Sequence, residues 1–353
     1  MRSCETMKRT SAARTFACSL WPTRLRSVAI SVYRAIEMRQ MTYPTEAHPL
    51  AQAFLEKARA AQEGGNEQML EPARFRDLLD ARALNNGLPV TPVASVVDVI
   101  ARWDGREIPV RVYYPDISQP VAFSLYFHGG GFMVGNLETH DKICRFLASR
   151  AKVAIVAVDF RLSPEHVFPA AHDDCLAACL WILRHAEQHG LDARRFALAG
   201  ESSGGHLALS TAYRLIEGNH PLPRTQLLLY PLVEMSTDSP AYRQFGSGYL
   251  LTEQRMRFYL DSYLAGADIT DERLSLLRSP FLGRSSPTYV MTAGLDPTLS
   301  HAQMLVERLR QDGVAVTYDH FQGWPHGFLF WGHEAGAIKA LEKASDALAA
   351  GLA

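Results

Sequence analysis

A serine set between glycines is the first residue whose surroundings suggest chemistry. Residues 200–205 read Gly-Glu-Ser-Ser-Gly-Gly, so the pattern G-x-S-x-G centres on Ser202. An apolar run at residues 196–199 precedes this pattern, and a helical stretch at 207–217 follows it. A serine on such a strand-to-helix turn presents its hydroxyl at the end of a sheet, where it can attack a carbonyl carbon. The pattern alone is common, so the prediction of a nucleophilic Ser202 depends on this setting.

A second glycine-rich segment, His128-Gly129-Gly130-Gly131, follows another apolar run at residues 124–127. Consecutive glycines leave their backbone N–H groups unshielded, so these groups can converge on a negatively charged oxygen. We predict an oxyanion hole formed by the N–H groups of Gly129 and Gly130 and by that of Ser203, the residue after the nucleophile. A flexible loop or a phosphate-binding turn is the alternative, but neither a Walker lysine nor a G-x-G-x-x-G pattern follows.

A serine hydroxyl needs a neighbouring base to become a good nucleophile. Histidine, with an ordinary pKa of about 6.5, can accept the proton at neutral pH. Of the 13 histidines, His326 is the best placed, because it comes just after the apolar run at residues 314–321. That position puts it at the end of a strand, where an active site should form.

The carboxylate that orients the histidine should lie between the serine and the histidine in the chain. Asp296 meets this condition and follows the apolar run at residues 288–292. Asp319 lies inside a strand pattern, and Asp173 and Asp174 precede the serine. We therefore predict Asp296 as the orienting acid.

The elements that must position these residues alternate between strand and helix. Short apolar runs at residues 124–127, 153–158, 196–199, 226–230, 288–292 and 314–321 are separated by helical stretches. This alternation predicts parallel β-α-β units with helices on both faces of the sheet and the active site at the carboxyl ends of the strands. Before them, residues 95–114 alternate apolar and polar around Asp104-Gly105, which predicts an antiparallel pair of strands.

Two segments do not fit this alternation. Residues 234–284 are about twice as long as the other crossovers and contain a helical pattern, which Thr252 and Glu253 could begin. Residues 49–88 have apolar residues at helical intervals and should form two or three helices. We predict that both segments contribute to a helical lid over the site.

Residues 1–40 differ from the rest, because eight basic side chains face only two acidic ones. They resemble an organelle transit segment, or else translation starts at Met41 and the leader is an artefact of gene prediction. The predicted organisation is a basic leader at 1–40, N-terminal helices of the cap at 41–92, and a catalytic domain at 93–353 with a cap insertion at about 234–284.

The composition excludes several classes of protein. The net charge of −1 gives no reason to expect nucleic acid or an anionic membrane as a partner, and no apolar stretch is long enough to span a membrane. The five cysteines form neither a disulfide framework nor a paired zinc pattern, which favours a reducing, cytoplasmic compartment. Cys175 and Cys179, four residues apart, are expected to be small buried side chains.

Further motifs occur in a fixed order along roughly residues 97–330. Besides 128–132 and 200–205, they are Thr139-His140-Asp141, Asp159-Phe160-Arg161-Leu162-Ser163-Pro164-Glu165 with Phe168-Pro169-Ala170, Asp296-Pro297 and His326-Gly327-Phe328. With this set of motifs, the chain resembles the hormone-sensitive-lipase-like esterases, bacterial family IV, of the α/β-hydrolase superfamily. Two residues depart from the family pattern: Glu201 stands where aspartate is usual, and Phe160 stands where tyrosine is usual. Neither removes a catalytic group.

The resemblance implies an α/β-hydrolase fold, with a mostly parallel central sheet flanked by helices and a helical cap. It implies a serine carboxylesterase with the triad Ser202, Asp296 and His326, which hydrolyses short- to medium-chain acyl esters through an acyl-enzyme, without a metal or a cofactor. The partner would be a small ester, and both a monomer and a homodimer stay open. Lid side chains could line an acyl pocket or pack the lid onto the core: Phe245, Tyr249, Leu250, Met256 and Tyr259.

Other activities could use the same residues. An amidase, a formamidase or a lactonase would pass through the same oxyanion, and the sequence does not separate them from an esterase. Some relatives of this family are receptors that bind a small hormone and have lost the catalytic histidine. The presence of Ser202, Asp296 and His326 argues against a receptor.

Overall fold

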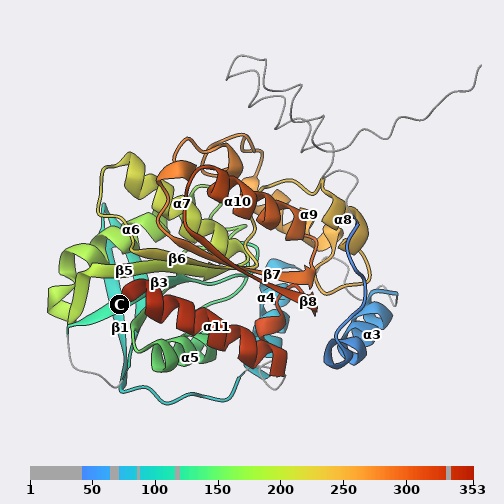
Figure 1. Ribbon diagram of the computed structural model, residues 1–353, viewed down its shortest axis with the longest axis horizontal. Helices are drawn as coiled ribbons and strands as arrows, with labels where there is room; N and C mark the ends of the chain where they lie inside the picture. The colour runs from blue at the N-terminus through green and yellow to red at the C-terminus, as the bar shows by residue number, and fades with distance from the viewer. Residues whose placement is uncertain (1–41, 64–70, 86–87, 116–119, 331–334) are drawn as a thin grey trace, which may run out of the picture. The chain divides into compact units, whose positions relative to one another are not determined.

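The central sheet accounts for the position of every predicted site residue. The computed structural model describes residues 42–353 apart from 64–70, 86–87, 116–119 and 331–334, so the predicted leader at 1–40 lies outside the described residues. Within them, eight strands pair in the order β1-β2-β4-β3-β5-β6-β7-β8 (Figure 1). The strands are β1 Ser95–Trp103, β2 Arg106–Tyr114, β3 Val121–Phe127, β4 Ala154–Val158, β5 Leu191–Glu201, β6 Thr225–Leu229, β7 Thr288–Leu295 and β8 Val316–Pro325. The six predicted runs are all strands, and their pairs are parallel, as expected.

The predicted antiparallel pair is also confirmed. β1 and β2 pair antiparallel from Ser95↔Tyr114 to Trp103↔Arg106, and β2 then pairs antiparallel with β4. The turn between them consists of Asp104 and Gly105, whose φ angles are 49° and 73°. A two-residue turn with positive φ at both positions matches the twist of the flanking strands, which is why Asp-Gly is favoured here.

The strands at the centre of the sheet read as apolar runs because both of their faces are covered. β3, β4, β6 and β7 are buried along their whole length. In β3, Phe123 and Leu125 pack into the apolar layer on one face, and Ala122 and Tyr126 pack into the layer on the other. Continuous burial of this kind is typical of parallel strands between two helical layers.

Helices form those two layers (Figure 1). α6 Ala170–His185, α7 Ser203–Glu217 and α10 Leu299–Gln311 lie on one face, and α5 Asp141–Ala151 and α11 Ala335–Leu352 lie on the other. Short 3-10 helices connect the larger elements: η1 Glu187–His189, η2 Leu276–Arg278, η3 Leu282–Arg284 and η4 Phe328–Phe330. The apolar stripe of each long helix is therefore buried against the sheet.

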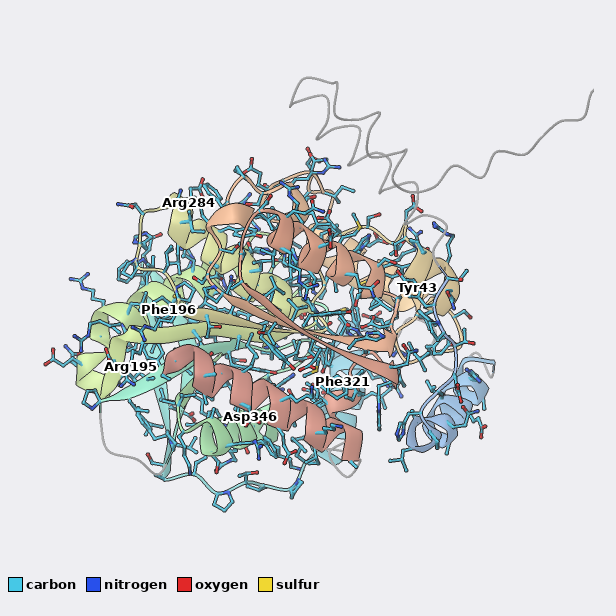
Figure 2. The ribbon with its side chains drawn as sticks, viewed as in Figure 1. Tyr43, Arg195, Phe196, Arg284, Phe321 and Asp346 are labelled. Carbon is cyan, nitrogen blue, oxygen red and sulfur yellow. The ribbon has the colours of Figure 1, made fainter. Side chains whose placement is uncertain are left out.

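The long crossover between β6 and β7 contains α8 Pro240–Phe245 and α9 Glu253–Leu264. α9 begins where the sequence predicted, because the Thr252 hydroxyl oxygen accepts a hydrogen bond from the N–H of Arg255 at 3.1 Å. Tyr43, near the start of the described residues, lies beside this crossover (Figure 2), and its N–H donates to Gln244 Oε1 at 2.8 Å. The inserted segment is thus fixed to the N-terminal part of the chain.

Two helices, α3 Pro49–Glu63 and α4 Pro72–Asn85, occupy the N-terminal stretch for which two or three were expected. Cys175 and Cys179 on α6 are fully buried, as predicted for small apolar side chains, whereas Cys4 and Cys18 lie outside the described residues. Over the described ranges, no helix combines the length and the apolar character needed to cross a membrane.

Candidate active site

Ser202 lies on the sharp turn between β5 and α7. Its φ of 56° and ψ of −121° are unusual for a residue with a side chain, and such strain persists only where the surroundings enforce it. The N–H of Ser202 donates to the carbonyl of Leu229 at the end of β6, at 2.9 Å. A Cβ atom on Gly204 would lie 1.9 Å from the carbonyl oxygen of Phe127, so only glycine lets the turn approach β3 this closely.

The structure brings Ser202, His326 and Asp296 into one hydrogen-bonded chain. Ser202 Oγ lies 2.8 Å from His326 Nε2, and His326 Nδ1 lies 2.7 Å from Asp296 Oδ2. Asp296 Oδ1 accepts hydrogen bonds from the N–H and the hydroxyl of Thr298, at 2.7 and 2.8 Å. A carboxylate held in this way accepts a hydrogen bond from the N–H at Nδ1, which leaves Nε2 free to accept the proton of the serine.

Each member of this chain follows the carboxyl end of a strand. Ser202 follows β5, Asp296 follows β7 and His326 follows β8, whose last residue is Pro325. The rival Asp319 lies within β8, where its carboxylate accepts from Lys343 Nζ at 2.5 Å and from the Tyr289 hydroxyl at 2.9 Å. Asp319 therefore contributes to packing at the sheet edge rather than to the triad geometry.

The charge near His326 favours its protonated form. Burial lowers the pKa of His326, but the charge of Asp296, its hydrogen bond to Nδ1 and the charge of Glu201 together outweigh that effect, and the net result is a raised pKa. The buried imidazolium that would form during proton transfer is thus stabilised by two carboxylates.

This raised pKa predicts the acid side of the pH profile. A general base must be neutral to accept a proton, so kcat/KM should fall as the pH drops through the pKa of His326. Since that pKa lies above the ordinary value of 6.5, the half-maximal point should lie above pH 6.5. Hydrolysis of p-nitrophenyl acetate, measured at constant ionic strength between about pH 5 and 9, checks this. A half-maximal point below the ordinary value would contradict the described electrostatics.

The structure corrects one member of the predicted oxyanion hole. The N–H of Gly129 donates to Glu201 Oε1 at 2.6 Å, so this donor is occupied by a charged acceptor. By contrast, the N–H groups of Gly130 and Gly131 have no acceptor within the described part of the chain, and both glycines line the cavity beside Ser202. Ser203 is the first residue of α7, where N–H groups have no partner inside the helix. The available donors are therefore Gly130, Gly131 and Ser203.

A cavity of about 260 Å³ extends over these groups. Its apolar walls come largely from the inserted segment, which supplies Leu250, Leu251, Met256 and Tyr259; Val134, Leu232 and Phe330 lie outside that segment. Three of the five lid side chains considered for such a pocket thus line it. The other two, Phe245 and Tyr249, pack against each other instead, with ring centroids 5.2 Å apart.

Besides Glu201, two charged side chains line this cavity, Asp80 from α4 and Arg255 from α9. Asp80 Oδ2 accepts a hydrogen bond from Asn136 Nδ2 at 2.8 Å. One helical turn earlier, Arg76 Nε donates to the carbonyl of Met133 at 2.7 Å. One face of α4 therefore holds the loop that follows the glycine-rich segment, a role that the sequence did not reveal.

Glu201 and His140 were noted in the sequence only as parts of motifs. In the structure, His140 Nε2 lies 2.9 Å from Glu201 Oε1, and both side chains are buried at the cavity wall. They are 61 residues apart in the chain, so no local pattern could have paired them. Over the described residues, no group of three or more histidine, cysteine or carboxylate side chains is arranged to hold a metal ion.

Comparisons with known proteins show which family this chain is similar to. The sequence profile of the alpha/beta hydrolase fold matches residues 124–330. The chain is 38% identical over 234 residues to the ethyl acetate hydrolase of Pseudomonas putida, across 65% of this chain and 74% of that protein. It is 33% identical over 257 residues to the carboxylic ester hydrolase LipN of Mycobacterium tuberculosis, across 70% of this chain and 68% of that protein.

Among solved structures, the chain is similar to an alpha/beta hydrolase enzyme from the metagenome of Lake Arreo, Spain. The TM-score is 0.83 at 32% sequence identity, across 87% of this chain and 99% of that one. The predicted fold, a mostly parallel sheet between helical layers, is confirmed. The chain belongs to the hormone-sensitive-lipase-like esterases, bacterial family IV, of the α/β-hydrolase superfamily.

Proposed function

We propose that this protein is a carboxylic ester hydrolase that uses Ser202 as its nucleophile, His326 as its general base and acid, and Asp296 as the group that orients the histidine. The observation that carries this proposal is the chain of two hydrogen bonds from Ser202 Oγ through His326 to Asp296, at 2.8 and 2.7 Å, at the wall of a cavity.

The reaction follows from these contacts. Ser202 Oγ adds to the ester carbonyl carbon while its proton moves to His326 Nε2. The carbonyl oxygen becomes an oxyanion, which the N–H groups of Gly130, Gly131 and Ser203 stabilise. The C–O bond to the alcohol then breaks, and the imidazolium returns its proton to the departing oxygen.

Water completes the cycle by the same route. It gives a proton to His326 Nε2 and adds to the carbonyl of the acyl-enzyme. The bond to Ser202 Oγ then breaks, and Oγ takes the proton back, so that the carboxylic acid leaves and the enzyme is restored. The balanced reaction is ester plus water giving acid plus alcohol.

The substrate we propose is a small ester with a short to medium acyl chain. The cavity, at about 260 Å³, is smaller than most drug-sized ligand pockets, and aliphatic and aromatic side chains make up much of its wall. The two relatives described above, an ethyl acetate hydrolase and a carboxylic ester hydrolase, support the ester class.

We also propose that α4 and the segment at about 234–284 form a cap over this site. Asp80 of α4 and Leu250, Met256 and Tyr259 of the segment share the cavity with Ser202, which supports this role. In this proposal, the cap selects the acyl chain, whereas the sheet carries the chemistry.

A covalent probe and a substrate series test the proposal together. A fluorophosphonate should form one adduct, which peptide mass spectrometry should locate on Ser202. The p-nitrophenyl esters from acetate to decanoate should give the highest kcat/KM for a short or medium chain, because the cavity must accommodate the acyl group. A probe adduct on another residue would refute the nucleophile, and a preference for the longest chain would refute the proposed substrate class.

A further inference from the structure

Glu201 contacts the glycine-rich loop at the wall of the cavity that holds Ser202. A single oxygen, Oε1, accepts the N–H of Gly129 at 2.6 Å and lies 2.9 Å from His140 Nε2. Its carboxylate is buried. A Cβ atom on Gly129 would lie 2.3 Å from Oε1, so this approach of backbone to carboxylate requires glycine.

The same residue directly precedes Ser202. Glu201 is the last residue of β5, and its backbone is therefore fixed by the sheet that also fixes the nucleophile. Across the loop, Asp80 and Arg76 of α4 hold Asn136 and Met133. α4 therefore holds the loop on one side, and Glu201 holds it on the other. Because Glu201 directly precedes Ser202, its contact fixes where the loop lies relative to the nucleophile.

Glu201 is also a charge close to the reacting groups. Burial raises its pKa, but the hydrogen bond and charge of His140, the N–H of Gly129 and the charge of His326 outweigh burial, so the pKa of Glu201 is lowered and the side chain is ionised at neutral pH. Four other buried titratable groups interact with its charge: the phenols of Tyr126 and Tyr230, the imidazole of His128 and the thiol of Cys144. Around His326, the facing groups are Asp296, Glu201 and the ring of Tyr230.

We propose that Glu201, held by His140, is a positioning residue for the oxyanion hole: it holds the Gly129 N–H so that those of Gly130 and Gly131 remain available beside Ser202, and its charge helps to stabilise the His326 imidazolium. This inference depends on the proposed esterase function. It assigns two roles, one carried by a hydrogen-bond acceptor and one by a negative charge, and two variants separate them.

Glu201→Gln keeps an oxygen that can accept from both Gly129 and His140 but removes the charge. Its kcat should fall by less than about 10-fold, because the hydrogen bonds that position the loop remain. The half-maximal point on the acid side of the pH profile should move to lower pH, because the imidazolium of His326 loses a neighbouring negative charge.

Glu201→Ala removes both the acceptor and the charge. Its kcat should fall by about 100-fold with KM changed less than about 2-fold, because a displaced loop weakens binding of the transition state and not of the ground state. Glu234→Gln is the matched control, because Glu234, like Glu201, accepts from one side chain and one backbone N–H but does not line the cavity. Its partners are Ser275 Oγ at 2.7 Å and the N–H of Leu277 at 3.0 Å. The kcat and pH profile of Glu234→Gln should be unchanged.

Thermal unfolding of each variant separates a folding defect from a positioning defect. Glu201→Gln keeps the shape of the side chain and supplies the decisive pH measurement even if Glu201→Ala does not fold. An unmoved acid limb in Glu201→Gln, or a folded Glu201→Ala with normal kcat, would overturn the inference. The Glu201 variants and Ser202→Ala are all measured with p-nitrophenyl butyrate. A Ser202→Ala enzyme that stays active would overturn the proposed esterase mechanism, whereas the Glu201 results test only the positioning role.

Discussion

Replacing Ser202 by alanine is expected to lower kcat/KM for p-nitrophenyl butyrate by about 10⁶-fold. The variant removes the oxygen that lies 2.8 Å from His326 Nε2, so no acyl-enzyme can form. Alanine fits the same turn without adding bulk, and the fold should be retained. Steady-state kinetics, together with loss of fluorophosphonate labelling, measures the effect.

Ser210→Ala is the matched control for this loss. Ser210 is a buried serine on α7, the helix that Ser202 precedes, and its hydroxyl has no hydrogen-bond partner among the described residues. Its activity should stay within about 2-fold of the unmodified enzyme, because surface or core changes far from the reacting atoms leave transition-state binding intact. Substantial residual hydrolysis by Ser202→Ala, above that of the buffer, would show that another residue is the nucleophile.

Asp296→Asn should lower kcat by about 10⁴-fold while leaving the geometry almost unchanged. The amide oxygen can keep both hydrogen bonds from Thr298, at the position that Oδ1 holds at 2.7 and 2.8 Å. The amide nitrogen then faces His326 Nδ1 and donates to it, which forces the imidazole proton onto Nε2. In that tautomer Nε2 cannot accept the proton of Ser202.

Asp319→Asn is the control that tests the rival carboxylate. Asp319 accepts from Lys343 and Tyr289 at the edge of the sheet, so its loss of charge should affect stability slightly and kcat by less than about 2-fold. The two variants change the same functional group by the same substitution. If Asp319→Asn were the more damaging to kcat, the assignment of Asp296 as the orienting acid would be wrong.

The two carboxylates near His326 both favour the protonated form of its imidazole. Asp296 holds the imidazole from one nitrogen, and Glu201 adds charge without a bond to the ring. A site that holds its histidine in this way stabilises the imidazolium in the transition state but loses its base at higher pH than an isolated histidine would. The pH profile therefore measures the pKa of His326, and the Glu201 variants measure how much the charge of Glu201 contributes to it.

The sequence by itself determined the nucleophile, the base and the acid as candidates, and it also predicted the sheet. Ser202, Asp296 and His326 each follow an apolar run, and parallel strands direct their carboxyl ends to one edge of a sheet. Chain order then distinguishes Asp296 from Asp319 and from the acids before the serine. The sequence predicts these features because an apolar strand run involves only neighbouring residues, and the order of residues along the chain is given directly by the sequence.

Only the tertiary structure decided which glycine N–H groups are free. The sequence predicted the N–H groups of both Gly129 and Gly130, but the N–H of Gly129 donates to Glu201, which lies 72 residues away in the chain. The tertiary structure also decided that Leu250 and Met256 line the cavity, whereas Phe245 packs against Tyr249. The physical reason is that a backbone N–H binds whichever acceptor packing brings near it, and an apolar side chain packs against whichever apolar surface is close. Both outcomes depend on contacts between distant segments, which no local sequence pattern encodes.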